Sequence, residues 1–233
     1  MRPFTHLAAM ELKLLARDSG NVFFMVALPL LLLILNSENK TLTNFLPGYI
    51  AMALAIGGIN TLPGVIGSYR EGKVLRRLAT TPISPLALLG AQFVAQMVLG
   101  LLATLIIVGA GILVFGVDPP RHPLSLALAF LLCSTMANTL GFLIASVART
   151  AISAGVMGLM VMFPSIFLAG AAVPRGGLPE SVQRVGDFLP LTYGVTALRQ
   201  GWFETPTLMP FLLLIGIIVI CTAGAAFLFR WDR

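Results

Sequence analysis

The sequence contains little charge. Only 10% of its residues are Asp, Glu, Lys or Arg, whereas 58% are hydrophobic. Soluble globular domains are about 25% charged and about 45–50% apolar, so this balance excludes an ordinary soluble domain and predicts a membrane protein. The apolar residues form long runs and not short alternating segments, and the predicted spans are therefore helices rather than barrel strands.

The side chains that most often carry chemistry are also scarce. The two histidines, His6 and His122, lie outside the apolar runs, and the two cysteines, Cys133 and Cys221, lie inside them as small apolar residues. The sequence shows no cluster with metal-ligand spacing and no candidate catalytic triad. We therefore predict no metal site, no catalytic residue and no enzymatic activity in this chain.

Six apolar runs are candidates for membrane spans, since a helix needs about 20 residues to cross a core about 30 Å thick. The first run is the shortest, and it is interpreted as a retained span because no small-residue cleavage site clearly follows it. Two polar residues separate the fourth run from the fifth, which predicts a tight helical hairpin. The expected fold class is an all-α membrane protein, a single transmembrane domain over residues 1–233, with spans at about 22–35, 47–67, 86–115, 124–148, 151–173 and 207–229.

The positions of the basic residues predict the orientation of these spans. Ten Lys and Arg residues fall on the side of the two termini and five on the other, and the acidic residues leave the whole net charge of +6 on the first side. Both termini and residues 70–85 are therefore expected in the cytoplasm, and residues 174–204 outside. Topology accounts for the basic balance, so the expected partner is the lipid bilayer and not nucleic acid.

Residues 5–18 are predicted to form an amphipathic helix on the inner membrane surface. Leu7, Met10 and Leu14 share one face of this helix, and Glu11 is among the polar positions.

The stretch GSYREGKV, residues 67–74, is one residue away from a phosphate-binding loop. Val74 stands where that loop has the hydroxyl that holds Mg²⁺. A phosphate-binding loop also joins a strand to a helix in an α/β domain, and the spans on either side leave no room for one. The prediction is that this chain binds no nucleotide itself.

None of the predicted spans contains Asp, Glu, Lys, Arg or His. Ion-coupled transporters commonly place an ionisable relay at membrane depth. A chain with neither a relay nor a nucleotide site is either passive or driven by a partner, and residues 70–85 offer such a partner a place to act.

Two stretches resemble the ABC type-2 family of exporter permeases. REGKVLRRLATTPISPLALLGAQF, residues 70–93, is similar to the family's loop between the second and third spans. FPSIFLAGAAVPRGGLPESVQRVGDFLPLTYGVTALRQGW, residues 163–202, resembles its fifth span, the following outer turn and a Leu-Pro-Leu-Thr-Tyr segment. The N-terminal stretch ELKLLARDSGNVFFMVALPLLLL is a weaker third match.

The resemblance implies that the chain is the membrane half of an exporter, in the cytoplasmic membrane of a prokaryote. ATP and Mg would be bound by a separate ABC ATPase subunit, and a second permease, either another copy or a related chain, would complete the transporter. Residues 70–85 would receive the ATPase stroke, through Arg70, Glu71, Gly72, Leu75, Arg76, Leu78, Thr81 and Pro82.

The resemblance also places the transport path along the second and fifth spans, which favours Asn60, Thr61 and Ser165 as path residues. Phe163 and Phe167 are close by in the fifth span and would suit an apolar substrate. The alternative interpretation of these residues is packing and hydrogen bonding between helices. An extracellular gate is expected at Pro174, Pro179, Pro190, Thr192 and Arg199, although this segment could equally anchor the sixth span.

The expected substrate is an amphipathic or hydrophobic small molecule such as a drug, an antibiotic or a lipid. The alternative functions are a passive channel, a secondary carrier, or a membrane assembly factor that transports nothing.

Overall fold

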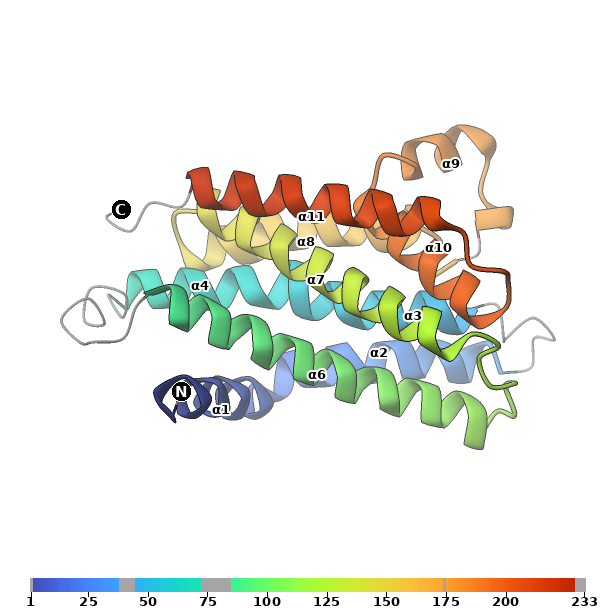
Figure 1. Ribbon diagram of the computed structural model, residues 1–233, viewed down its shortest axis with the longest axis horizontal. Coiled ribbons are helices and arrows are strands. Elements are labelled where there is room, and N and C mark those ends of the chain that lie inside the picture. The colour runs from blue at the N-terminus through green and yellow to red at the C-terminus, as the bar shows by residue number, and fades with distance from the viewer. Residues whose placement is uncertain (1, 38–44, 73–84, 174, 229–233) are drawn as a thin grey trace.

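The computed structural model describes residues 2–37, 45–72, 85–173 and 175–228. Every regular element within these ranges is helical, which confirms the all-α prediction. Figure 1 shows the long helices running side by side as one bundle. Five helical segments are long and apolar enough to cross a membrane singly, and a sixth qualifies if the first two helices count as one bent span.

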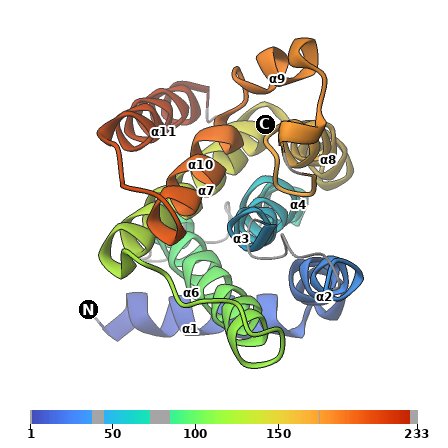
Figure 2. The ribbon, with the colours of Figure 1, turned by 90° about the vertical axis from the view of Figure 1, so that its right-hand side faces the viewer.

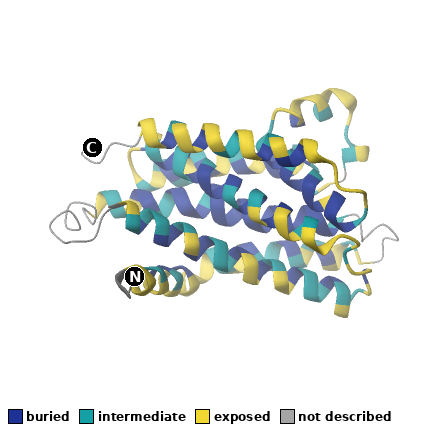
Figure 3. Ribbon diagram, viewed as in Figure 1, coloured by how far each residue is buried: buried dark blue, intermediate teal, exposed yellow. Residues whose placement is uncertain are grey.

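The second span is the centre of the bundle. It consists of α3 (Leu46–Ala55), the π-helical segment η2 (Ile56–Thr61) and α4 (Leu62–Glu71). Seen along the bundle, α3 and α4 are surrounded by the other helices (Figure 2). In its most apolar stretch 83% of the residues are buried, against 22% in the peripheral helix α11 (Leu208–Leu228), and Figure 3 shows the same contrast.

Three further spans surround this centre: α6 (Pro85–Leu113), α7 (Pro123–Val147) and α8 (Ala151–Leu168). A tight turn joins α7 to α8, as the sequence predicts, although it has three residues instead of two because α7 ends at Val147. The fifth span was expected to reach Val173 but ends at Leu168. Gly170 follows with a positive φ of 82°, a conformation that favours glycine and turns the chain away from the helix axis.

The first two helices, α1 (Arg2–Arg17) and α2 (Ser19–Leu35), meet at an angle of 69°. Asp18 caps α2 by accepting from the N–H of Asn21 at 3.4 Å, so this helix begins at Ser19, before the expected start of the first span. α1 lies across the bundle axis and packs against α6, which it crosses (Figures 1 and 2). This position suits a helix at the membrane surface.

One detail of the expected amphipathic helix is wrong. Glu11 was assigned to its polar face, but the structure buries this side chain to 4% exposure together with Leu15, one turn later. Met10 and Leu14 are exposed instead. α1 therefore packs on the bundle through a face that includes a carboxyl group.

The segment after α8 contains two helices in very different settings. The short helix α9 (Glu180–Gly186) stands clear of the bundle, whereas α10 (Pro190–Trp202) is buried between α7, α3 and α11 (Figure 1). The Trp202 indole is fully buried, and its Nε1 donates to the carbonyl of Asp118 at 3.0 Å. The backbone N–H groups of Arg121 and His122 donate to the carbonyls of Trp202 and Gly201, and these bonds join the same loop to the end of α10. The loop between α6 and α7 is thus fixed to the end of α10.

Replacing Trp202 by alanine should lower the free energy of unfolding by about 3–5 kcal/mol, the usual cost of removing a large aromatic side chain from a core. Trp202→Phe should cost less, because the phenyl ring still fills much of the space, although the bond to Asp118 and part of the indole volume are lost. Denaturant unfolding in mixed micelles, followed by circular dichroism, would measure both variants. Equal stability of Trp202→Ala and the parent chain would contradict this account.

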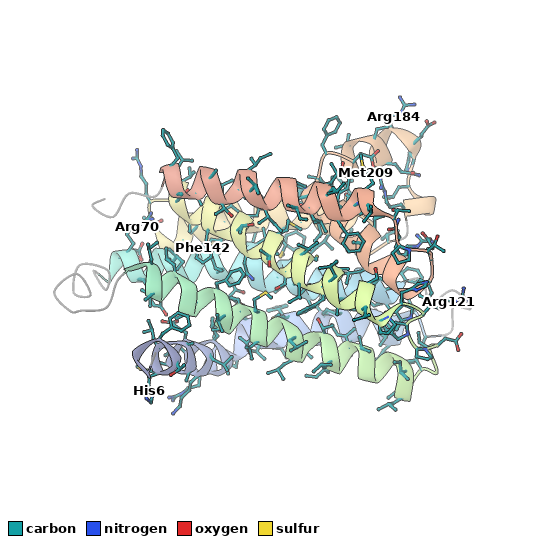
Figure 4. All side chains as sticks on the ribbon, viewed as in Figure 1. His6, Arg70, Arg121, Phe142, Arg184 and Met209 are labelled. Carbon is teal, nitrogen blue, oxygen red and sulfur yellow. The ribbon has the colours of Figure 1, made fainter. Side chains whose placement is uncertain are left out.

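The two ends of the bundle differ in what they carry. The start of α1, the end of α4, the α7–α8 turn and the end of α11 lie at one end, where Arg70 is labelled in Figure 4. α9 and the short 3₁₀ helix η3 (Arg175–Gly177) lie at the other. These are called the Arg70 end and the α9 end below.

Candidate functional site: a helix-end clasp and a π-helical bulge

The last residues of α4 are bonded to both sides of the turn between α7 and α8. The Arg70 guanidinium donates from Nη1 to the carbonyl oxygen of Ala148, the C-cap of α7, at 2.7 Å. Glu71 Oε1 accepts from the backbone N–H of Ala151, the first residue of α8, at 3.0 Å. We call these two bonds the clasp. They fix the end of the central span to a hairpin about 80 residues further along the chain.

The charges of the clasp match the helix ends that they meet. The C-terminus of a helix carries partial negative charge and the N-terminus partial positive charge, on backbone groups that have no partner inside the helix. The cation of Arg70 meets a carbonyl at the end of α7, and the anion of Glu71 meets an N–H at the start of α8. Each bond therefore satisfies an end group and also interacts favourably with the helix dipole.

The clasp depends on a close approach between backbones. A β-carbon at Gly67 would lie 2.7 Å from the Cα of Ala151, a separation that two carbon atoms cannot adopt without moving. The start of α8 is held in addition by a capping box, in which Ser153 donates its N–H to Thr150 Oγ1 and accepts from the Thr150 N–H, both at 3.0 Å. The end of α4 and the capped start of α8 are therefore in close contact.

α1 is joined to the same end of α4. The Tyr69 hydroxyl donates to Glu11 Oε2 at 2.5 Å, and this carboxyl group is buried. Burial raises the pKa of Glu11 above its ordinary value of 4.5, while the hydrogen bond from Tyr69 opposes that shift. Three consecutive residues, 69 to 71, thus contact α1, the end of α7 and the start of α8.

The Glu11–Tyr69 bond gives a prediction with a definite sign. Tyr69→Phe should lower the free energy of unfolding at neutral pH by about 1.5–3 kcal/mol, because a buried carboxylate loses its donor. The folded state holds the Glu11 proton more tightly than the unfolded state, so this group favours folding as pH falls through its raised pKa towards 4.5. Glu11→Gln keeps an acceptor for Tyr69 and should abolish that part of the pH dependence. Unfolding measured at several pH values would test both statements.

Three of the predicted coupling residues lie in the described part of the chain. Arg70 and Glu71 form the clasp, and Gly72 ends α4, with its N–H donating to the carbonyl of Ser68 at 2.9 Å. The other five, Leu75, Arg76, Leu78, Thr81 and Pro82, lie outside the described residues.

The second notable feature is the π-helical bulge η2 in the middle of the central span. Its hydrogen bonds run five residues back, as from the Leu62 N–H to the carbonyl of Gly57. The Thr61 hydroxyl donates to the carbonyl of Ile56 at 3.0 Å. Pro63 follows Leu62 and would donate to Gly58, five residues earlier, in the same pattern. Proline has no N–H, so the carbonyl of Gly58 receives no such bond. π-bulges occur frequently at functional sites.

Two glycines from neighbouring helices press against the carbonyls of this bulge. A β-carbon at Gly141 of α7 would lie 2.0 Å from the Gly58 oxygen, and one at Gly158 of α8 would lie 2.7 Å from the Ile59 oxygen. The Cα–H groups of both glycines therefore face carbonyl oxygens, a weak hydrogen-bonding arrangement common at helix contacts. In the opposite direction, a β-carbon at Gly58 would lie 2.7 Å from the Ala137 carbonyl carbon of α7. Small residues thus let three backbones meet at one point.

Buried amide side chains occur on two helices that contact the bulge, α6 and α7. The Gln96 Oε1 atom of α6 lies 3.2 Å from the position of a β-carbon on Gly57. Gln92, one turn earlier on α6, and Asn138 on α7 are also buried. Within the described ranges, both amide atoms of Gln92, the Gln96 nitrogen and the Asn138 oxygen have no hydrogen-bond partner. A buried polar group without a partner costs free energy.

The structure brings only some of the predicted path residues together. Asn60 and Thr61 lie at the bulge, and Asn60 contacts α8 at Gly158. Ser165 is buried but donates within its own helix, to Val161 at 2.6 Å. Phe163 and Phe167 are about half exposed, on the outer face of α8.

The predicted gate residues at the α9 end are similarly dispersed. Pro179 caps α9, and Pro190 begins α10. Thr192 is buried and donates to the carbonyl of Gly186 at 2.5 Å, whereas Arg199 is partly exposed and lies 3.4 Å from Glu204. Pro174 lies outside the described residues.

Sequence reasoning missed the role of Gly141. Gly141 is a single glycine within an apolar helix, and that is the only signal the sequence offers for a close backbone contact. The clasp partners, Ala148 and Ala151, use backbone atoms and carry no sequence signal. Among the described residues, no group of three or more His, Cys, Asp or Glu side chains could hold a metal ion.

Comparison with known proteins identifies the family. The sequence model of the ABC-2 type transporter family matches residues 3–203, a range that contains the clasp, the bulge and α10. A comparison with curated proteins finds no match. The match covers most of the chain, and the membrane domain of this family is the permease component of an ABC transporter. The chain therefore belongs to the ABC-2 type transporter family, as one of its permeases.

Proposed function

We propose that this permease is driven by a separate ABC ATPase subunit and exports an amphipathic or hydrophobic small molecule across the cytoplasmic membrane of a prokaryote. The observation that carries the coupling is the clasp. Residues 70–85 are the segment that resembles the family's ATPase-contacting loop, and its first two residues are bonded to the α7–α8 hairpin. A force on this loop would reach α8 through Glu71 and α7 through Arg70.

The positive-inside rule supports placing the Arg70 end in the cytoplasm, because ten of the fifteen Lys and Arg residues are assigned to that side. A soluble ATPase would then meet α1 and residues 70–85 at the same surface. ATP and Mg would be bound by that subunit alone.

The outer face of α8 supports an apolar or amphipathic substrate and a second permease. Phe163 and Phe167 are exposed there beside Met160, and the predicted spans carry no charged side chain. Two copies of the chain, or this chain and a related one, would enclose a path between such faces. The uncharged walls favour a ligand that needs no ionic partner.

Co-purification with an ATPase tests this function. The chain is isolated from native membranes in a mild detergent, and accompanying proteins are identified by mass spectrometry and assayed for ATP hydrolysis. Leu75→Asp should reduce the recovered ATPase about tenfold or more, since a charge would replace an apolar contact in the interface. Val185→Asp, which adds the same charge on an exposed residue of α9, should have no effect.

Recovery of the chain without any ATPase in several detergents and in nanodiscs would overturn the coupled mechanism. A flux assay in vesicles would then distinguish a passive channel or carrier from an assembly factor, which transports nothing.

A further inference from the structure

A groove of about 400 Å³ opens between α6, α7 and α11. It is lined by Leu89, Gly90 and Phe93 of α6, by Phe142 of α7, and by Ala225 and Ala226 of α11, among others. We propose that this groove binds one acyl chain of a bilayer phospholipid, from the leaflet at the Arg70 end. This goes beyond export and does not depend on an ATPase.

The depth of the groove in the bundle identifies the leaflet. Its α6 residues belong to the first turns of that helix, and its α11 residues to the last turns, so the groove lies towards the Arg70 end, where Figure 4 labels Phe142. All three walls are candidate spans. The medium that meets the groove between these spans is therefore lipid.

The chemistry of the walls suits an alkyl chain and not a polar ligand. Hydrocarbon side chains form most of the lining, and the two hydroxyl groups in it belong to Thr139 and Thr222. The Thr139 hydroxyl already donates to the carbonyl of Met136 at 3.0 Å. Gly90, Ala225 and Ala226 supply little side-chain volume, and their small size keeps the groove open.

The length of the groove distinguishes an acyl chain from a partner helix. Its α6 wall runs from Leu86 to Phe93, a rise of about 11 Å at about 1.5 Å per residue. One leaflet contributes about half of a hydrocarbon core about 30 Å thick, so the groove matches part of a single acyl chain. A spanning helix of a second copy would need a contact along the full thickness of the core.

Photo-crosslinking tests the proposal. The chain is reconstituted into phosphatidylethanolamine vesicles that contain a small fraction of the same lipid with a diazirine in one acyl chain, irradiated and digested. Labels should concentrate on residues 86–93 and 222–226. Ala226→Leu should reduce this labelling about tenfold or more, because the leucine would take the place of several acyl methylenes.

Ala223→Leu is the matched control. Ala223 lies on the same helix and is also exposed, but it does not line the groove. Lipid labelling of the groove in this variant should therefore equal that of the parent chain. Equal labelling in both variants, or labels spread evenly over the outer faces of α6, α8 and α11, would overturn the proposal. Absence of lipid labels from residues 86–93 and 222–226 of the parent chain would overturn it as well.

Discussion

Gly141→Ala is expected to destabilise the bundle by more than about 3 kcal/mol, above the usual cost of overpacking a core. The added methyl group would lie 2.0 Å from the carbonyl oxygen of Gly58. Both atoms would be fixed to backbones, so no side-chain rotation relieves the contact, and α7 would have to move away from the central span. The expected result is a loss of monodisperse protein on size-exclusion chromatography and a lower denaturant midpoint in mixed micelles.

Two glycines of α8 provide a matched test of the same idea. A β-carbon at Gly158 would lie 2.7 Å from the carbonyl oxygen of Ile59, whereas one at Gly155 would meet nothing within 4 Å. Gly158→Ala should therefore be destabilising, and Gly155→Ala should be neutral or stabilising by up to about 1 kcal/mol, because alanine favours helix more than glycine. Equal effects of the two substitutions would mean that contact with the bulge does not explain the stability of the bundle.

The spans could be predicted because they depend on local composition. Long apolar runs specify a helix wherever lipid leaves the backbone no other partner, and the hairpin between α7 and α8 follows from the presence of only Arg149 and Thr150 between two such runs. The residues at which the helices end were harder to predict. The fifth span continues as an apolar sequence to Val173, but the backbone turns at Gly170, and hydropathy carries no information on φ.

The site depends on which helices are neighbours, and a single sequence does not state that. Gly57, Gly58 and Pro63 are close together in the second span, yet the π-helix and its contact with Gly141 appear only once α7 is placed against it. Glu11 was misassigned for the same reason. Periodicity places it among polar residues of an amphipathic helix, and only the position of α1 beside α4 brings it to Tyr69.

Loss of the clasp is expected to uncouple the permease. Glu71→Ala removes the acceptor of the Ala151 N–H, and Arg70→Ala removes the donor to the Ala148 carbonyl. Loss of a helix cap costs about 1 kcal/mol, so each variant should remain folded. The α4 end would then move without moving the hairpin. In the double variant the ATPase should still assemble with the permease, while substrate export and substrate-stimulated ATP hydrolysis should fall by about tenfold or more, as when about 1.4 kcal/mol or more of coupling is lost.

The conservative variant separates the clasp from charge alone. Glu71→Gln keeps an oxygen that can accept from Ala151 but removes the negative charge, so it should retain more export than Glu71→Ala. If both variants export equally poorly while the ATPase still binds, the charge of Glu71 matters and its bond to α8 does not. If Arg70→Ala and Glu71→Ala are each normal and the double variant is normal too, force reaches α7 and α8 by another route. A double-mutant cycle on export rates distinguishes these results, because two bonds that act on one hairpin should give effects that are not additive.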